Sequence, residues 1–175
     1  MLLSISKLED EKLVFEQSYQ PGDIDFSDEN VKQSGPLVGV GEAELLPHTG
    51  GEVRVKGSVK AILESECDRC LGTARFDIDA PFDLFYRPNT MANDEEEHLI
   101  DEGETQIGFY ELPGLELEDI LREQVVLQLP MQHVCKPDCL GLCPICGANL
   151  NETKCGCASR PGDDRWLALQ NIAND

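Results

Sequence analysis

Two runs of alternating apolar residues, separated by a short cysteine-containing segment, constrain the fold more than any other feature. The apolar positions of the first run are Val53, Val55, Val59, Ala61 and Leu63. Those of the second run are Ala74, Phe76, Ile78, Ala80, Phe82 and Leu84. A period of two predicts strands that bury one face. Because only a short connection with Cys67 and Cys70 separates the runs, we expect an antiparallel pair with both cysteines near its tip.

Three further segments have weaker patterns. Leu13–Tyr19 is predicted to be a strand, and so is Leu37–Leu46, although its glycines weaken that pattern. Leu115–Leu129 is predicted to be a helix that ends before Pro130, because apolar residues recur at helical spacing. That stripe consists of Leu117, Ile120, Leu121 and Val125. Acidic residues fall in the expected first turn, where the helix dipole favours them.

Charge and cysteine content divide the chain into two parts. The whole chain has 175 residues, with 34 Asp and Glu against 14 Lys and Arg, a formal net charge of −20. Residues 131–175 contain only five of the acids but six of the eight cysteines. We therefore expect an acidic β-rich body at 1–130 and a cysteine-rich tail at 131–175. Within the body, residues 89–105 are expected to form an acidic flexible loop, since residues 94–104 hold seven acids and no Lys or Arg. The alternative is that this segment is an acidic arm that docks on a basic partner.

The acidity limits the classes of partner. A charge of −20 disfavours a broad electrostatic grip on nucleic-acid phosphates or on anionic membranes. No apolar run approaches the ~18 residues of a membrane-spanning helix, and the first 16 residues lack the features of a secretory signal. We expect a cytoplasmic protein without a membrane partner, whose cysteines stay reduced.

The tail has the pattern of a zinc site. Its six cysteines are Cys135, Cys139, Cys143, Cys146, Cys155 and Cys157. Cys143-Pro144-Ile145-Cys146-Gly147 has the form of a zinc knuckle, so Cys143 and Cys146 are the firmest predicted ligands. Two of the other four would complete a closed structural shell of four thiolates, and spacing alone does not choose them. Inert reduced thiols and an iron–sulfur cluster are the alternatives.

The predicted fold class is therefore α+β, with an antiparallel sheet body, one or two helices and a small C-terminal zinc-binding appendage. Metal binding would supply folding free energy to a tail that has few apolar residues.

Cys67 and Cys70 admit three interpretations. A thiol redox motif normally lies where a strand leads into a helix, whose N-terminus lowers a thiol pKa, and a position between two strands disfavours this reading. A structural turn with reduced thiols is favoured. Alternatively, the pair completes a second metal shell with cysteines left over from the tail.

Basic residues concentrate around the same two strands. Five of the ten in the body are Arg54, Lys56, Lys60, Arg69 and Arg75. An ordinary solvated sheet face is the simpler interpretation, but this is also where the body could contact phosphate or another partner. No phosphate loop, dinucleotide fingerprint, nucleophile elbow or metalloprotease helix occurs, so we expect neither catalysis nor a small-molecule substrate.

Several of these segments together resemble the YceD family, which is associated with accumulation of large-subunit ribosomal RNA in bacteria and plastids. The resemblance rests on residues 55–59, Cys67-Asp68-Arg69-Cys70-Leu71, 117–124 with 127–130, and Cys139 to Asn151 with Cys155-Gly156-Cys157. It implies a non-enzymatic accessory role in large-subunit assembly or rRNA processing. It also implies a partner in precursor large-subunit rRNA, in a basic large-subunit ribosomal protein, or in both.

Two other functions remain open from the sequence. One is a thiol redox protein that uses Cys67 and Cys70. The other is an acidic chaperone that shields a basic ribosomal protein without contacting rRNA.

Overall fold

A computed structural model describes residues 1–89 and 107–157. Its elements, in chain order, are β1 (Leu2–Ser4), α1 (Ile5–Leu8), β2 (Leu13–Tyr19), the 3₁₀ turn η1 (Ser27–Glu29), β3 (Val31–Gln33), β4 (Leu37–Leu45), β5 (Val53–Glu66), β6 (Thr73–Pro88), β7 (Ile107–Tyr110), β8 (Gly114–Glu116) and α2 (Leu117–Leu127). The acidic loop expected at 89–105 lies outside the described residues except for Asn89, as do tail residues 158–175.

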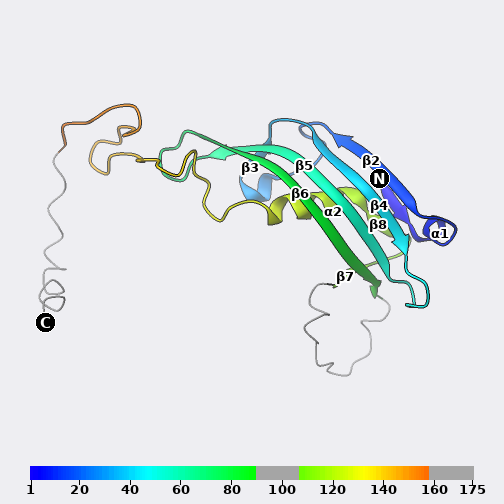
Figure 1. Ribbon diagram of the computed structural model, residues 1–175. Helices are drawn as coiled ribbons and strands as arrows, with labels where there is room; N and C mark the ends of the chain where they lie inside the picture. The colour runs from blue at the N-terminus through cyan, green and yellow to red at the C-terminus, as the bar shows by residue number, and fades with distance from the viewer. Residues whose placement is uncertain (90–106, 158–175) are drawn as a thin grey trace, which may run out of the picture.

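The elements form an α+β fold with one large and one small sheet. The large sheet has the order β2-β4-β5-β6-β7 (Figure 1). Strand β3 pairs with the C-terminal part of β5, past the residue at which β4 begins. All pairings of this sheet are antiparallel except that of β7, which runs parallel to β6. The small sheet pairs β1 with β8.

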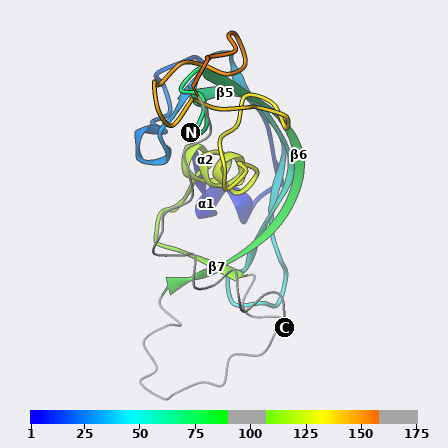
Figure 2. The ribbon, with the colours of Figure 1, turned by 90° about the vertical axis from the view of Figure 1, so that its left-hand side faces the viewer.

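The expected antiparallel pair is confirmed as β5 and β6, which are in register from Val53↔Tyr86 to Glu66↔Thr73. Alternate residues of β5 are buried as predicted, with Val55 and Val59 both 0% exposed. Figure 2 shows the sheet curving around α2, which occupies its concave side. The apolar face of the sheet and the helix share one core.

Helix α2 is shorter than predicted but buries the predicted stripe. Leu117, Ile120, Leu121 and Val125 are at most 3% exposed. The helix begins at Leu117 because Leu115 belongs to β8, where it pairs with Leu3. Apolar spacing alone does not distinguish this strand residue from a residue of the first helical turn.

The glycines that weakened the strand pattern of β4 have a structural role. Gly41 of β4 and Gly57 of β5 lie opposite one another in the register. A Cβ atom on Gly41 would collide with the Lys56 carbonyl oxygen, and one on Gly57 with the Val40 carbonyl oxygen. The two strands therefore approach at a point that only glycine permits.

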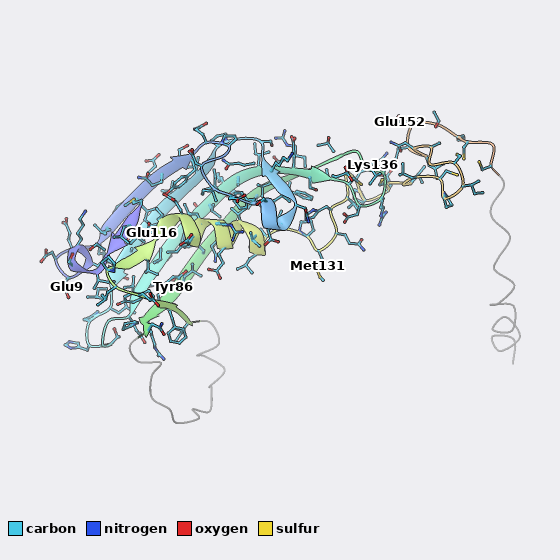
Figure 3. The ribbon with its side chains drawn as sticks, turned by 180° about the vertical axis from the view of Figure 1, so that it is seen from behind. Glu9, Tyr86, Glu116, Met131, Lys136 and Glu152 are labelled. Carbon is cyan, nitrogen blue, oxygen red and sulfur yellow. The ribbon has the colours of Figure 1, made fainter. Side chains whose placement is uncertain are left out.

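The tail begins beyond α2 and meets the tip of the β5–β6 pair. Figure 3 places Lys136 and Glu152 at the end of the molecule opposite Glu9. A small second core joins tip and tail there, with buried Cys67, Cys70, Ala74 and Cys139. Among the described residues, no helix is long and apolar enough to cross a membrane.

Candidate metal centres

The eight cysteines gather into two groups of four. The first, here called the hairpin cluster, contains Cys67, Cys70, Cys135 and Cys139. The second, here called the knuckle cluster, contains Cys143, Cys146, Cys155 and Cys157. In each group the sulfur atoms all lie within 4.8 Å of one another. The described residues thus offer two sets of donors, each sufficient for one four-coordinate ion.

The sulfur spacing in the hairpin cluster fits a tetrahedral ion. Four thiolates about 2.3 Å from a zinc ion lie roughly 3.8 Å from one another. The Cys67 and Cys139 sulfurs are 3.9 Å apart, and those of Cys70 and Cys135 are 3.7 Å apart. Disulfide sulfurs would be about 2.05 Å apart, and all eight cysteines are free.

The turn between β5 and β6 presents Cys67 and Cys70 to the tail. The Cys67 N–H donates to the Gly72 carbonyl at 2.7 Å, and the Leu71 N–H donates to the Cys67 carbonyl at 2.9 Å. Leu71 adopts a left-handed backbone, with φ 59°, which closes the turn. Both thiols are therefore held at the same end of the strand pair.

Backbone and side-chain donors surround the sulfurs of this cluster. The Cys135 N–H donates to the Cys67 sulfur, and the Asn151 Nδ2 donates to the Cys139 sulfur, each at 3.3 Å. Burial of the Cys67 thiol opposes its ionisation, but N–H groups of Cys135, Arg69 and Cys70 outweigh this effect and lower its pKa to about 6. Such donors stabilise thiolates, which are the form that binds metal.

The Cys135 thiol competes with its neighbours in the hairpin cluster for ionisation. Burial, followed by hydrogen bonding with Cys139, Cys70 and Cys67, raises the pKa of Cys135 to about 12. Negative charge on neighbouring sulfurs disfavours a further thiolate. A divalent cation at the centre would remove this conflict, because it attracts all four thiolates.

The knuckle cluster is built by a tight turn of the tail. The Gly147 N–H donates to the Cys143 carbonyl at 2.9 Å, and the Cys143 N–H donates to the Ala148 carbonyl at 2.8 Å. Gly147 has φ 73°, a conformation that glycine adopts without strain. N–H groups of Cys146 and Ile145, with the Cys155 thiol, lower the pKa of Cys143 to about 6.

The two clusters differ in exposure. Three cysteines of the hairpin cluster are buried, whereas Cys143 alone is buried in the knuckle cluster.

His133, the histidine nearest the tail cysteines in sequence, belongs to neither group. The His133 N–H donates to the Asp68 carboxylate, and the His133 carbonyl accepts from the Asp68 N–H, each at 2.7 Å. The His133 ring packs on Phe76.

Asn151 and Arg69 connect the clusters, although sequence reasoning assigned Asn151 no role of its own. The Asn151 side chain accepts from the Leu140 N–H at 3.0 Å in addition to its contact with Cys139. The Arg69 carbonyl accepts from the Leu142 N–H at 3.0 Å, just before the knuckle. Both residues lie within motifs noted above, but spacing gives no signal of these contacts.

The structure places the five basic residues beside acids or the tail. Arg54 forms two hydrogen bonds with Asp83, of 2.8 and 2.6 Å. Lys60 pairs with Asp79 at 3.0 Å and Arg75 with Asp77 at 3.1 Å. Lys56 lies opposite Glu42 and Asp83 in the register.

Arg69 donates to the Pro137 and Cys139 carbonyls, each at 3.3 Å. Much of the positive charge on this face is thus matched by neighbouring carboxylates, and a phosphate contact there stays a prediction.

Residues 55–173 match the family described as large ribosomal RNA subunit accumulation protein YceD. The chain belongs to the YceD family. The match includes both thiol clusters, β6 and α2, and it confirms the resemblance inferred from the sequence motifs.

Relatives of this YceD-family chain occur in bacteria and plants. An uncharacterized protein of Mycobacterium tuberculosis is 35% identical over 124 residues, which cover 67% of this chain and 54% of the relative. The Arabidopsis thaliana protein named large ribosomal RNA subunit accumulation protein YCED homolog 1, chloroplastic, is 27% identical over 143 residues, 69% of this chain and 44% of its own length.

A Zea mays protein with the same name is 29% identical over 140 residues, 67% of this chain and 47% of its own. The chain thus spans about half the length of the curated relatives it matches. No solved structure matches it.

Proposed function

We propose that this chain is a non-enzymatic accessory factor for the accumulation of large ribosomal subunit RNA in the cytoplasm. The observation that carries the proposal is membership of the YceD family across residues 55–173, together with the names of its plant relatives. The buried Cys67 and Cys70, 0% and 7% exposed, disfavour the redox alternative, because a reactive thiol must be accessible.

The test is the ratio of large- to small-subunit rRNA in cells depleted of the protein. We expect a selective fall in the large-subunit species that the wild-type chain restores. An unchanged ratio would contradict the proposal.

We further propose that each thiol cluster holds one structural zinc ion. The supporting observation is the tetrahedral sulfur spacing of the hairpin cluster and the matching set of four thiols in the knuckle cluster. Zinc would supply a closed shell without an open position for substrate. The ion in the hairpin cluster would fix the tail to the β5–β6 tip, because this cluster takes two ligands from each.

Elemental analysis of protein purified under reducing conditions tests this proposal. We expect two zinc ions per chain and no iron. The variant Cys67→Ser/Cys70→Ser and its matched control Cys143→Ser/Cys146→Ser should each retain one ion. If the first double variant retained both ions, Cys67 and Cys70 would be structural thiols instead.

Direct rRNA contact and chaperoning of a basic protein remain distinct forms of this function. Charge reversal at Arg54, Lys56 and Lys60 should abolish rescue of the rRNA ratio if that face contacts phosphate. It should leave rescue intact if the protein acts as an acidic chaperone. Thermal unfolding of the variant serves as the control, since the reversal also breaks ion pairs with Asp83 and Asp79.

A further inference from the structure

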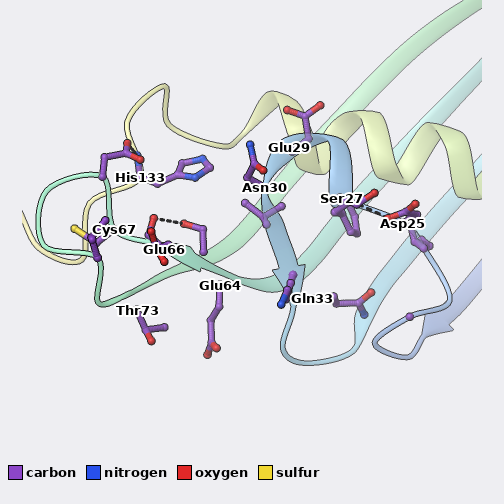
Figure 4. Close-up of a pocket in the computed structure, with 18 of the residues that line it drawn as sticks. Asp25, Ser27, Glu29, Asn30, Gln33, Glu64, Glu66, Cys67, Thr73 and His133 are labelled. Carbon is purple, nitrogen blue, oxygen red and sulfur yellow. Dashed lines mark hydrogen bonds between the residues drawn. The ribbon is translucent and has the colours of Figure 1, made fainter.

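A large groove lies beside the hairpin cluster and shares Cys67 with it. It extends from Cys67 and His133 past Gln33 on β3 to Asp25 (Figure 4). Its volume is about 1190 Å³, which exceeds the roughly 300–1,000 Å³ of small-molecule pockets. The size suits a stretch of polypeptide better than a metabolite.

The charge of the groove is strongly one-sided. Five carboxylates line it against one ammonium group, that of Lys32: Asp25, Glu29, Glu64, Glu66 and Asp68. Within the described part of the chain, no ion pair joins any of these five carboxylates to a cation. Three acids of β6, in contrast, form ion pairs: Asp83 with Arg54, Asp79 with Lys60, and Asp77 with Arg75.

Gln33 supplies a second and independent observation. Its side chain lines the groove and is only 9% exposed. Its Nε2 donates to the Tyr19 and Gly35 carbonyls, at 2.9 and 2.8 Å, which fixes the orientation of the amide. Its Oε1 is buried without a hydrogen-bond partner among the described residues. A buried acceptor without a donor is unfavourable, and a cationic N–H donor from a bound segment would complement it.

The apolar surface of the groove also fits a peptide. Ile24, Phe26 and Val31 are buried along it. Two exposed apolar side chains also line it: Leu71 is 58% exposed and Met131 is fully exposed. Carboxylates with an apolar edge match a segment in which Lys or Arg residues flank an apolar side chain. RNA would meet the carboxylates with like charge.

We propose that this groove docks a Lys- and Arg-rich segment of a partner protein. The inference deepens the proposed function by naming the kind of partner, and it rests on that function for its biological setting alone. Docking holds by charge complementarity, because cationic side chains of the segment meet five carboxylates that only one ammonium group in the lining offsets.

Fluorescence anisotropy of the full chain with a short labelled peptide, rich in Arg and Lys with one central Leu, tests the proposal. The variant Glu29→Gln/Glu64→Gln/Glu66→Gln should weaken binding about tenfold. The control Glu9→Gln/Asp10→Asn/Glu11→Gln removes the same charge from exposed positions near α1, at the other end of the molecule (Figure 3). It should retain the wild-type affinity within about twofold. Equal losses in both variants would show attraction to the acidic chain as a whole and overturn the proposal.

A gain-of-affinity variant excludes misfolding as the cause. Lys32→Gln removes the cation that lines the groove and should tighten peptide binding about twofold or threefold. Unchanged or weaker binding would contradict the proposal. So would binding of a labelled single-stranded RNA that the groove variant abolishes. The rRNA ratio is not measured in this assay, so docking and the proposed function can fail separately.

Discussion

Asn151 lies where one side chain could support a candidate metal site without belonging to it. It contacts the Cys139 sulfur of the hairpin cluster and the Leu140 N–H on the way to the knuckle. Hydrogen bonds of this kind orient ligands and tune their basicity. The identity of residue 151 should therefore affect metal affinity although its amide is not a ligand.

The variant Asn151→Ala is expected to weaken zinc binding about 10- to 100-fold, because the Cys139 thiolate loses a donor. Competition with a chromogenic chelator measures the affinity. Lys154→Ala, at an exposed position close in sequence to Asn151, is the control and should match the wild type. Equal affinities for all three chains would contradict a supporting role for Asn151.

Asp83 gives a second prediction at the residue scale. Hydrogen bonding by Arg54 lowers the pKa of the Asp83 carboxyl in the folded chain. A lowered folded-state pKa stabilises the fold above the ordinary Asp value near 3.9, and this stabilisation is lost as the pH falls through the lowered value.

Asp83→Asn should therefore be less stable than the wild type near neutral pH, and the two unfolding curves should converge at acidic pH. Urea denaturation across a pH series measures the difference. The control Asp10→Asn removes a carboxylate at an exposed site. It should have the same stability as the wild type near neutral pH, so that its unfolding curve has no gap to close in acid. A gap between Asp83→Asn and wild type that persisted in acid would contradict the electrostatic cause.

At the scale of elements, the long β5–β6 pair decides where the functional groups lie. Its middle contributes the concave face that α2 covers (Figure 2). Its tip carries Cys67 and Cys70, and its flank at Glu64 and Glu66 lines the groove beside β3. Strand pairing thus places the thiols and the carboxylates next to one another.

The glycine pair between β4 and β5 is testable by substitution. Gly57→Ala should destabilise the fold by roughly 1–3 kcal/mol, because its methyl group would meet the Val40 carbonyl and the Phe82 ring. Chemical denaturation measures the loss. Gly35→Ala, whose methyl would meet only the Ile62 side chain, should cost less, and the opposite ranking would refute the steric explanation.

At the scale of the whole molecule, the body and the tail have different sources of stability. The core of the body joins strands β1 to β8 with α1 and α2. The second core contains three cysteines and one alanine among its buried residues. Burial of apolar area can therefore support the body, whereas the tail would gain its stability from the proposed zinc ions.

Removal of metal by a chelator is expected to expose amides at 131–157 to hydrogen exchange while strands β4, β5 and β6 stay protected. Hydrogen exchange read by mass spectrometry resolves the two regions. Re-addition of zinc should restore tail protection. Simultaneous loss of protection in both regions would show that the body and the tail unfold together, and would contradict a separate source of stability for the tail.

Local sequence determined the longer strands β2, β4, β5 and β6, the main helix and the knuckle. The alternation of residues 53–63 and 74–84 assigns their buried face, because strand side chains point alternately to opposite sides. The stripe from Leu117 to Val125 does the same for α2. The six shorter elements, among them β1, β3 and β8, lack enough residues for a period to be recognised.

The tertiary structure decided which thiols meet and which charges remain unmatched. Cys70 and Cys135 are 65 positions apart, yet their sulfurs are 3.7 Å apart, because the hairpin tip and the chain beyond α2 reach the same end of the sheet. Spacing left six tail cysteines as one set, and the fold sorts them into two. Likewise, the basic residues of β5 lie opposite acids of β4 and β6. Glu64 lies opposite Lys32 of β3 and Arg75 of β6, but within the described part of the chain it forms no ion pair with either. Cross-strand register, rather than composition, distributes the charge in this way, because it sets which side chains lie opposite one another.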